Sequence, residues 1–303
     1  MRLNLDNFDS RYGDEQSCIN YLIEQRWPDG RVCCLYCGSL SLYRLKRRYS
    51  YQCKDCHHQF SPKTGFPFER SKIPLRKWLK VLFLMTSRKH SVSSVQIADD
   101  LGITQKTAWN IMHDLRDFMY PDDTPRKGDW EVDETYDHPD ASKRSSALLK
   151  NRKRGKYGGE VIFGLLHRQS GEVRVFHVKS SGARVLLPII EKHIPKGSRI
   201  FSDEHGSYRR LTKLGYRHET TNHSKGERVI GDNNTQALES KWTHLKKIIR
   251  ATYMHASPEH MQKYCSEYAF RRTANASSLN HQQKMDKWFG NCVSDMASGR
   301  YIR

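Results

Sequence analysis

Two pairs of cysteines have the spacing of a metal-binding site. Each pair follows the pattern CxxC, and the four residues are Cys34, Cys37, Cys53 and Cys56. One pair can direct two thiolates at an ion, and two pairs with fifteen residues between them can complete the tetrahedral shell of a zinc ribbon. Cys33 could replace Cys34, although the CxxC spacing to Cys37 favours Cys34. Four thiolates leave no open position on the ion, so we expect a structural zinc and not a catalytic one.

Acidic residues form a second set that could do chemistry. Asp133 lies in WEVDET and Asp203 in IFSDE, which are both predicted strands, and Glu239 lies early in a predicted amphipathic helix. Transfer of a phosphodiester needs two divalent ions about 3.5–4 Å apart, and converging carboxylates could hold Mg²⁺ or Mn²⁺ there. Lys246 follows Glu239 by seven residues, or about two helical turns, so the two share one helix face. Lys246 could then contact a DNA phosphate near the site.

The residues alone leave this ligand set open. Each carboxylate could instead be a solvated surface group or a helix cap. Neighbouring acids also compete for the same roles, namely Glu134 and Asp137 for the first, Glu204 for the second and Asp232 for the third.

The net charge indicates a polyanionic partner. Lysine and arginine number 52 and aspartate and glutamate 33, which gives a formal charge of +19. In a chain whose hydrophobic fraction of 37% can build a core, this excess favours nucleic acid. A membrane partner is disfavoured, because the chain has no apolar run of about 18 residues. The first residues lack the pattern of a signal peptide, so we expect a cytoplasmic protein.

Residues 95–109 have the pattern of a helix-turn-helix. An apolar first helix is followed by a turn with Gly102 and by a second helix with a polar face. Thr104 would cap the second helix, and Gln105, Lys106 and Asn110 would face the major groove of DNA. A small three-helix packing unit can show the same pattern, so DNA recognition by these residues is a hypothesis.

The chain divides into segments of different composition. From Trp130 the pattern becomes α/β, and Gln169, Ser170 and Gly171 separate two strands of a predicted hairpin. The predicted fold class is therefore multidomain α/β. Its segments are a zinc ribbon with an N-terminal lead-in over 1–70, a helix-turn-helix domain over 71–120, a linker over 121–129, a catalytic domain over 130–275 and a tail over 276–303 without a specific prediction.

A basic insert interrupts the α/β pattern between Pro139 and about Gly159. It has no acidic residue from Ala141 onward, and its basic residues are Lys143, Arg144, Lys150, Arg152, Lys153, Arg154 and Lys156. Such a segment would bind backbone phosphates, or it would be a solvated loop that orders only on DNA.

Several of these motifs occur together in one family. The chain resembles bacterial insertion-sequence DDE transposases of the ISXO type, which carry an N-terminal zinc ribbon. The shared motifs are CxxC…CxxC, FSPKTGFPFERSKIPLRKWL, VDETY, FSDEHGSY and ALESKWTHLKK with its ExxW pattern. The resemblance implies a ribonuclease-H-like catalytic domain with a mixed sheet. It also implies Asp133, Asp203 and Glu239 as ligands of two Mg²⁺ or Mn²⁺ ions, with Lys246 as a fourth functional residue.

The expected function is DNA transposition. The ribbon and the helix-turn-helix would bind the inverted repeats at the ends of an element, and the catalytic domain would cleave strands and join them to target DNA. Joining two ends implies a homo-oligomer on DNA, associated with the nucleoid. One alternative is a zinc-ribbon DNA-binding regulator without enzymatic activity. Another is a nuclease of the same fold that cuts without joining.

Overall fold

The computed structural model describes residues 3–45, 49–88, 90–122, 124–137, 159–220, 236–253 and 256–298. The basic insert, with Lys143, Arg144, Arg152, Lys153 and Arg154, lies outside these residues. The chain forms two compact units, one of Met1–Phe118 with Leu279–Arg303 and the other of Met119–Ser278. In the described part of the chain, no helix is both long and apolar enough to cross a membrane.

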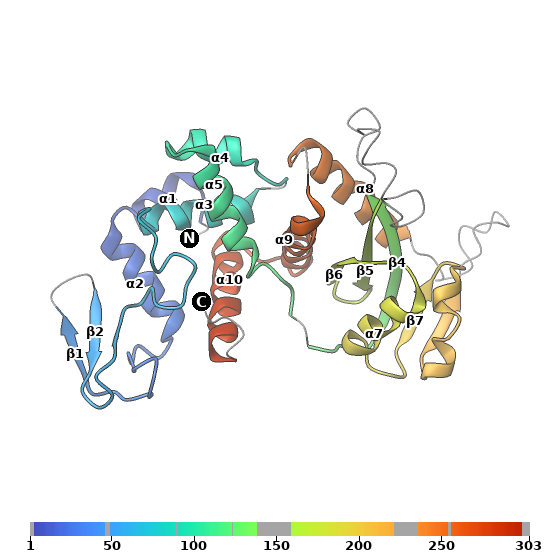
Figure 1. Cartoon of the computed structure of the whole chain (residues 1–303), viewed down its shortest axis with the longest axis horizontal. Helices are drawn as coiled ribbons and strands as arrows, with labels where there is room; N and C mark the ends of the chain where they lie inside the picture. Colours follow the sequence, from blue (N-terminus) through green and yellow to red (C-terminus); the bar gives the residue numbers. More distant parts are fainter. Residues whose placement is uncertain are drawn as a thin grey trace. The chain divides into compact units, whose positions relative to one another are not determined.

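The first unit begins with two helices and a small sheet (Figure 1). The helices are α1 (Leu5–Arg11) and α2 (Glu15–Arg26). The antiparallel strands, in the order β1-β2-β3, are β1 (Leu42–Leu45), β2 (Ser50–Cys53) and β3 (Gln59–Phe60). Trp27 and Phe60 are buried together with Cys34 and Cys53, so a small apolar cluster supports the sheet beside the end of α2.

The rest of the first unit is helical. Its elements are α3 (Leu75–Ser87), α4 (Ser94–Leu101), α5 (Gln105–Arg116) and, from the C-terminal segment, α10 (His281–Ala297). Segment 276–303 is therefore more than a tail, because α10 packs against α2 and α3. The physical reason is the apolar spacing of Met285, Trp288, Phe289 and Cys292, which are all buried on one helix face. The Trp288 indole also donates a hydrogen bond of 2.8 Å to the Leu115 carbonyl.

The second unit contains a five-stranded mixed sheet. Its strands are β4 (Asp129–Asp137), β5 (Glu160–His167), β6 (Val173–Val178), β7 (Arg199–Ser202) and β8 (Arg217–Thr220). The order is β6-β5-β4-β7-β8, with antiparallel pairing among the first three strands and parallel pairing from β4 to β8. The predicted hairpin is confirmed, since β5 and β6 are paired and the Gly171 N–H donates to the His167 carbonyl.

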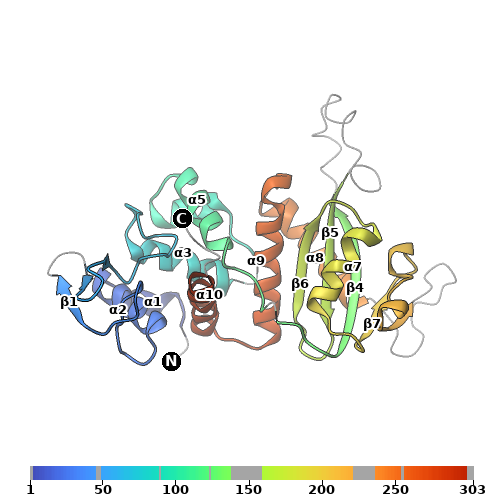
Figure 2. The same ribbon diagram turned by 60° about the horizontal axis from the view of Figure 1, so that its bottom comes forward.

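Helices cover both faces of this sheet (Figure 2). They are α7 (Ala183–His193), α8 (Gln236–Ala251) and α9 (Pro258–Ala276). Because side chains alternate along β5, Phe163 packs with α7 on one face and Ile162 packs with α8 and α9 on the other. The predicted mixed sheet is thus confirmed. Between β7 and β8 the chain forms two 3-10 turns, η2 (Gly206–Tyr208) and η3 (Thr212–Leu214), and Gly215 ends the second with a φ of 93°.

Two candidate metal centres

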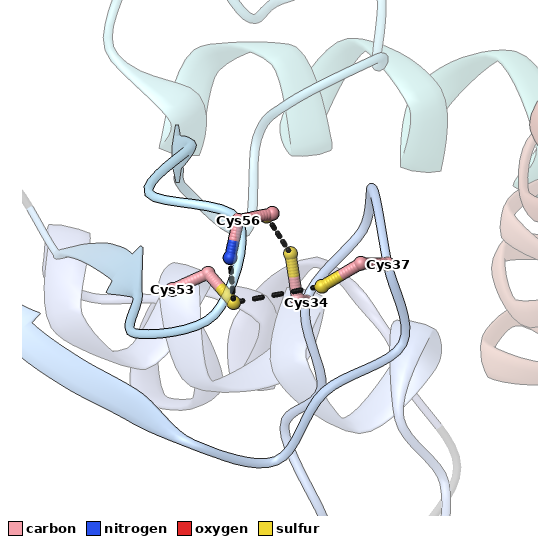
Figure 3. Close-up of side chains that lie close together, drawn as sticks. All are labelled: Cys34, Cys37, Cys53 and Cys56. Carbon is pink, nitrogen blue, oxygen red and sulfur yellow. Dashed lines mark hydrogen bonds between the residues drawn. The ribbon is translucent and has the colours of Figure 1, made fainter.

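The four predicted cysteines lie together at the edge of the small sheet (Figure 3). Their sulfur atoms all lie within 4.8 Å of one another. Sγ of Cys34 is 3.5 Å from that of Cys56, and the Cys37 and Cys53 sulfurs are equally close. Cys33 lies outside this group and packs against the apolar cluster of the ribbon, so the geometry favours Cys34 over Cys33 as the fourth ligand.

Local backbone geometry explains how each CxxC pair forms a knuckle. The Tyr36 N–H donates to Cys34 Sγ at 3.4 Å, and the Cys56 N–H donates to Cys53 Sγ at 3.5 Å. Such N–H donors stabilise a thiolate, and those of Cys56 and Asp55 lower the pKa of Cys53 to about 6. Four sulfur atoms this close to one another fit a structural zinc ion, which would hold the two knuckles together.

The first two predicted acids lie on neighbouring strands of the large sheet. Asp133 is in β4, and Asp203 directly follows β7. The parallel pairing of these strands matches Glu131 with Phe201, each two residues before an acid, and the charge of Asp203 acts on the Asp133 carboxylate. Burial, together with the negative charges of Glu134 and Asp203, raises the pKa of Asp133 to about 7. A buried carboxylate is destabilised by a neighbouring negative charge, and a cation would relieve that repulsion.

Trp242 on α8 contacts the first acid directly. Its indole Nε1 donates a hydrogen bond of 2.7 Å to Asp133 Oδ2. Gly164 on β5 pairs with Asp133, and a Cβ at this glycine would collide with the indole ring. Trp242 is the tryptophan of the ExxW motif, and the sequence alone indicates no role for it. The signal that could have found this role is the buried glycine in an otherwise apolar strand.

The remaining two predicted residues are on α8. Glu239 is exposed in the first turn, three residues before Trp242. Lys246 is half-buried, which lowers its pKa, while the charges of Asp133 and Asp137 act in the opposite direction. The Lys246 ammonium is thus in the electrostatic field of Asp133. Within the described ranges, the only group of three or more His, Cys, Asp or Glu side chains with closely spaced ligand atoms is that of the four cysteines, so the place of Glu239 among the acidic ligands stays a prediction.

The competing acids have other surroundings. Glu134 points to the opposite face of β4 from Asp133, where it accepts a hydrogen bond from the Tyr208 hydroxyl and lies 3.4 Å from Nδ1 of His205. Burial raises the pKa of Glu134. Glu204 is exposed, and Asp232 lies outside the described residues.

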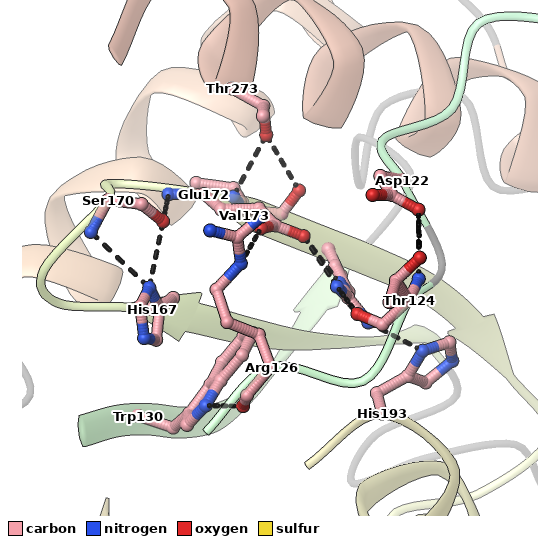
Figure 4. Close-up of polar contacts among 11 residues, drawn as sticks. Asp122, Thr124, Arg126, Trp130, His167, Ser170, Glu172, Val173, His193 and Thr273 are labelled. Carbon is pink, nitrogen blue, oxygen red and sulfur yellow. Dashed lines mark hydrogen bonds and ion pairs between the residues drawn. The ribbon is translucent and has the colours of Figure 1, made fainter. Parts of the chain in front are cut away.

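The segment that leads into β4 is attached to the sheet by buried charges (Figure 4). Arg174 on β6 is 1% exposed, pairs with Glu172 at 2.6 Å, and donates to the Thr124 carbonyl at 2.8 Å. Arg126 contacts the same glutamate at 3.1 Å. Residues of the segment predicted as a linker therefore belong to the second unit, because a buried arginine needs acceptors that the segment supplies.

Two helices joined by a turn occupy the predicted helix-turn-helix of the first unit. Gly102 has a φ of 59° in the turn between α4 and α5, and the Thr104 hydroxyl accepts a hydrogen bond of 3.2 Å from the Thr107 N–H at the start of α5. Gln105, Lys106 and Asn110 are exposed on α5, so all three are accessible to a partner. Their contact with DNA stays a prediction.

Comparison with known proteins shows the same two parts. Residues 126–273 match the model of the ISXO2-like transposase domain, and residues 13–59 match the transposase zinc-ribbon domain. A protein of transposable element ISH50 from Halobacterium salinarum is 26% identical over 279 residues, covering 85% of this chain and 90% of that protein. A chain in the structure of a simian T-cell lymphotropic virus intasome with a PP2A regulatory subunit is 17% identical with a TM-score of 0.29, covering 57% of this chain and 63% of that one.

The second unit is thus a ribonuclease-H-like domain, in which three antiparallel strands are followed by two parallel ones. The chain belongs to the ISXO2-like DDE transposases that carry an N-terminal zinc ribbon. Membership implies phosphoryl transfer as the class of reaction and DNA as the class of partner. The relative named above comes from an archaeal element, and the expected bacterial origin of this chain stays a prediction.

Proposed function

We propose that this chain is a transposase that binds the inverted repeats at the ends of a mobile element, cleaves a strand at each end and joins it to target DNA. The observation that carries the proposal is that buried Asp133 in β4 interacts electrostatically with Asp203, which follows the neighbouring parallel strand β7, and with Lys246 on α8. Strand cleavage and strand transfer are both in-line displacements at phosphorus, so a single site can perform both.

Asp133, Asp203 and Glu239 would hold two Mg²⁺ or Mn²⁺ ions. When bound, such ions activate the attacking oxygen and stabilise the leaving one. The oxygen donors fit these hard cations. Burial raises the pKa of Asp133 and the charges of Glu134 and Asp203 add to the effect, so a nearby cation would favour the ionised carboxylate. Trp242 would orient the Asp133 carboxylate through its indole hydrogen bond. Lys246 would bind a phosphate of the DNA strand beside the acids.

The first unit would supply DNA recognition. The exposed Gln105, Lys106 and Asn110 on α5 would read the major groove, and the zinc ribbon would bind next to them on the repeat. The net charge of +19 supports contacts with phosphates, including contacts from the basic insert. Because two element ends must be brought together, the active species would be a homo-oligomer on DNA, in the cytoplasm.

The test uses duplex oligonucleotides that carry the terminal repeat of the element encoding this chain. With Mg²⁺, the wild-type protein should yield cleaved ends and joined products. Asp133→Asn should reduce both by about 10³-fold or more, since several kcal/mol of charge stabilisation would be lost at 1.36 kcal/mol per tenfold. The control is Asp129→Asn, which changes another acid of the same strand and should retain activity.

The outcome also separates the alternatives. DNA binding without any product from the wild-type protein would favour a non-enzymatic regulator. Cleaved ends without joined products would favour a nuclease of the same fold. Full activity of Asp133→Asn would refute the assignment of the site.

A further inference from the structure

A buried carboxylate that the proposed chemistry does not use lies two residues before Asp133. Glu131 is 2% exposed and, by the alternation of strand residues, faces the same side of β4 as Asp133. Its Oε1 accepts a hydrogen bond of 2.9 Å from Nε of Arg168, and its Oε2 accepts one of 3.0 Å from the Leu238 N–H. Burial raises the pKa of Glu131, and these two donors lower it. Both carboxylate oxygens are therefore occupied by protein donors.

The two partners of Glu131 come from other elements of the site. Leu238 is the residue before Glu239, in the first turn of α8. An N–H in the first turn of a helix has no acceptor within the helix, so Glu131 caps α8 from a neighbouring strand. Capping by an outside carboxylate places this turn at a defined point of β4, two residues from Asp133.

Arg168 extends the connection to the strand of the second acid. It directly follows β5, and its guanidinium lies over the ring of Phe201, 3.6 Å from the centroid. Phe201 is on β7, two residues before Asp203. The Glu131–Arg168 pair thus connects β4, β7 and α8. On each of these elements the connected residue lies within two residues of a proposed metal ligand.

A buried ion pair contributes little net stability to a fold. Apolar residues of similar size commonly give equal or greater stability, because two desolvated charges recover only part of their lost hydration. What an ion pair with directed hydrogen bonds adds is geometry. Metal sites depend on such outer contacts, because they fix the positions of the ligands.

We propose that Glu131 and Arg168 are positioning residues, which set the place of the Glu239-bearing turn relative to Asp133 and Asp203. The inference rests on the proposed function, since it assumes that these three acids bind the catalytic ions. Neither residue of the pair contacts DNA or an ion in this role. Loss of the pair should weaken metal binding before it abolishes the fold.

The experiment compares two replacements of the glutamate in the full-length protein. Glu131→Gln keeps an oxygen that can accept from the Leu238 N–H, and Glu131→Ala keeps none. Manganese binding without DNA is followed by electron paramagnetic resonance, and the Mg²⁺ dependence of cleavage is measured in parallel. We expect Glu131→Ala to weaken metal binding by about 10- to 100-fold and Glu131→Gln to restore a large part of it.

A matched control is available on α9. Glu267 is fully buried, and its carboxylate accepts from Arg271 at 3.2 Å and from the Tyr253 hydroxyl at 2.9 Å. Glu267→Gln should lower the unfolding temperature without changing manganese binding. If Glu131→Ala is too unstable to purify, Arg168→Lys replaces it, because lysine keeps the charge but loses the planar contact with Phe201.

Asp133→Asn serves to separate the two levels of the proposal. If it leaves manganese binding unchanged, the proposed site is wrong. If it abolishes manganese binding while Glu131→Ala, or Arg168→Lys in its place, binds manganese like the wild type, the site stands and the positioning role is refuted.

Discussion

The cysteine site of the first unit and the carboxylate site of the second are built in opposite ways. The four cysteines lie within residues 34–56, and each knuckle is shaped by N–H groups next to its own sulfurs. Asp133, Asp203 and Glu239 come from two strands and a helix, and more than a hundred residues separate the first from the last. A locally encoded site needs only two short turns to meet, whereas the carboxylate site depends on strand register and helix docking.

The two sites also differ in what surrounds the ligands. Hydrogen bonds from adjacent backbone stabilise the Cys53 thiolate. Asp133 instead accepts a hydrogen bond from Trp242, which is distant in the sequence, and it loses hydration on burial. Substitutions should therefore act differently at the two sites. A change at one cysteine affects its own ribbon, whereas changes far along the chain can displace the acids.

The largest effect expected from a single change is at the ribbon. Cys37→Ser should abolish zinc binding and unfold residues 31–60, because sites of this type fold together with their metal. Cys33→Ser, at the neighbouring cysteine outside the group, should keep both zinc and fold. Zinc content by metal analysis and circular dichroism would measure this. Equal zinc in the two variants would break the contrast between local and assembled sites.

A smaller effect is expected at the lysine of α8. Lys246→Gln should slow cleavage by roughly 10²-fold, since a charged group that faces the reacting phosphate is lost. Lys247→Gln is the matched control, because its side chain is exposed on the same helix. Single-turnover cleavage at saturating protein would give both rates. Similar rates for the two variants would remove Lys246 from the site.

The smallest effect tests how the carboxylate site depends on packing between β5 and α8. Gly164→Ala should destabilise the second unit by about 1–3 kcal/mol, because the new Cβ displaces the Trp242 ring from Asp133. Gly206→Ala, where a Cβ meets nothing within 4 Å, should be neutral or slightly stabilising. Chemical denaturation gives the free energy of unfolding of both variants. If that of Gly164→Ala equals the wild-type value, the indole can move freely.

Local patterns predicted much of the fold. The turn at Gly102, the cap at Thr104 and the hairpin at Gly171 were predictable because each depends on residues within a few positions. The 3-10 turns before Gly215 were not, since short polar stretches carry weak periodicity. Helix α10 was not predicted, because its apolar face has a partner only after the chain returns to α2 and α3.

For the site, the sequence by itself determined the zinc ligands, since spacing alone decides which thiolates can meet around one ion. It also indicated Asp133, Asp203 and Glu239 as candidate ligands of the catalytic ions, through motifs that resemble those of the family. Only the tertiary structure brought Trp242 to Asp133 and coupled Glu131 to Arg168 and Leu238. The physical reason is that these contacts join residues far apart in sequence, and such contacts form only when strand register and helix packing are both in place.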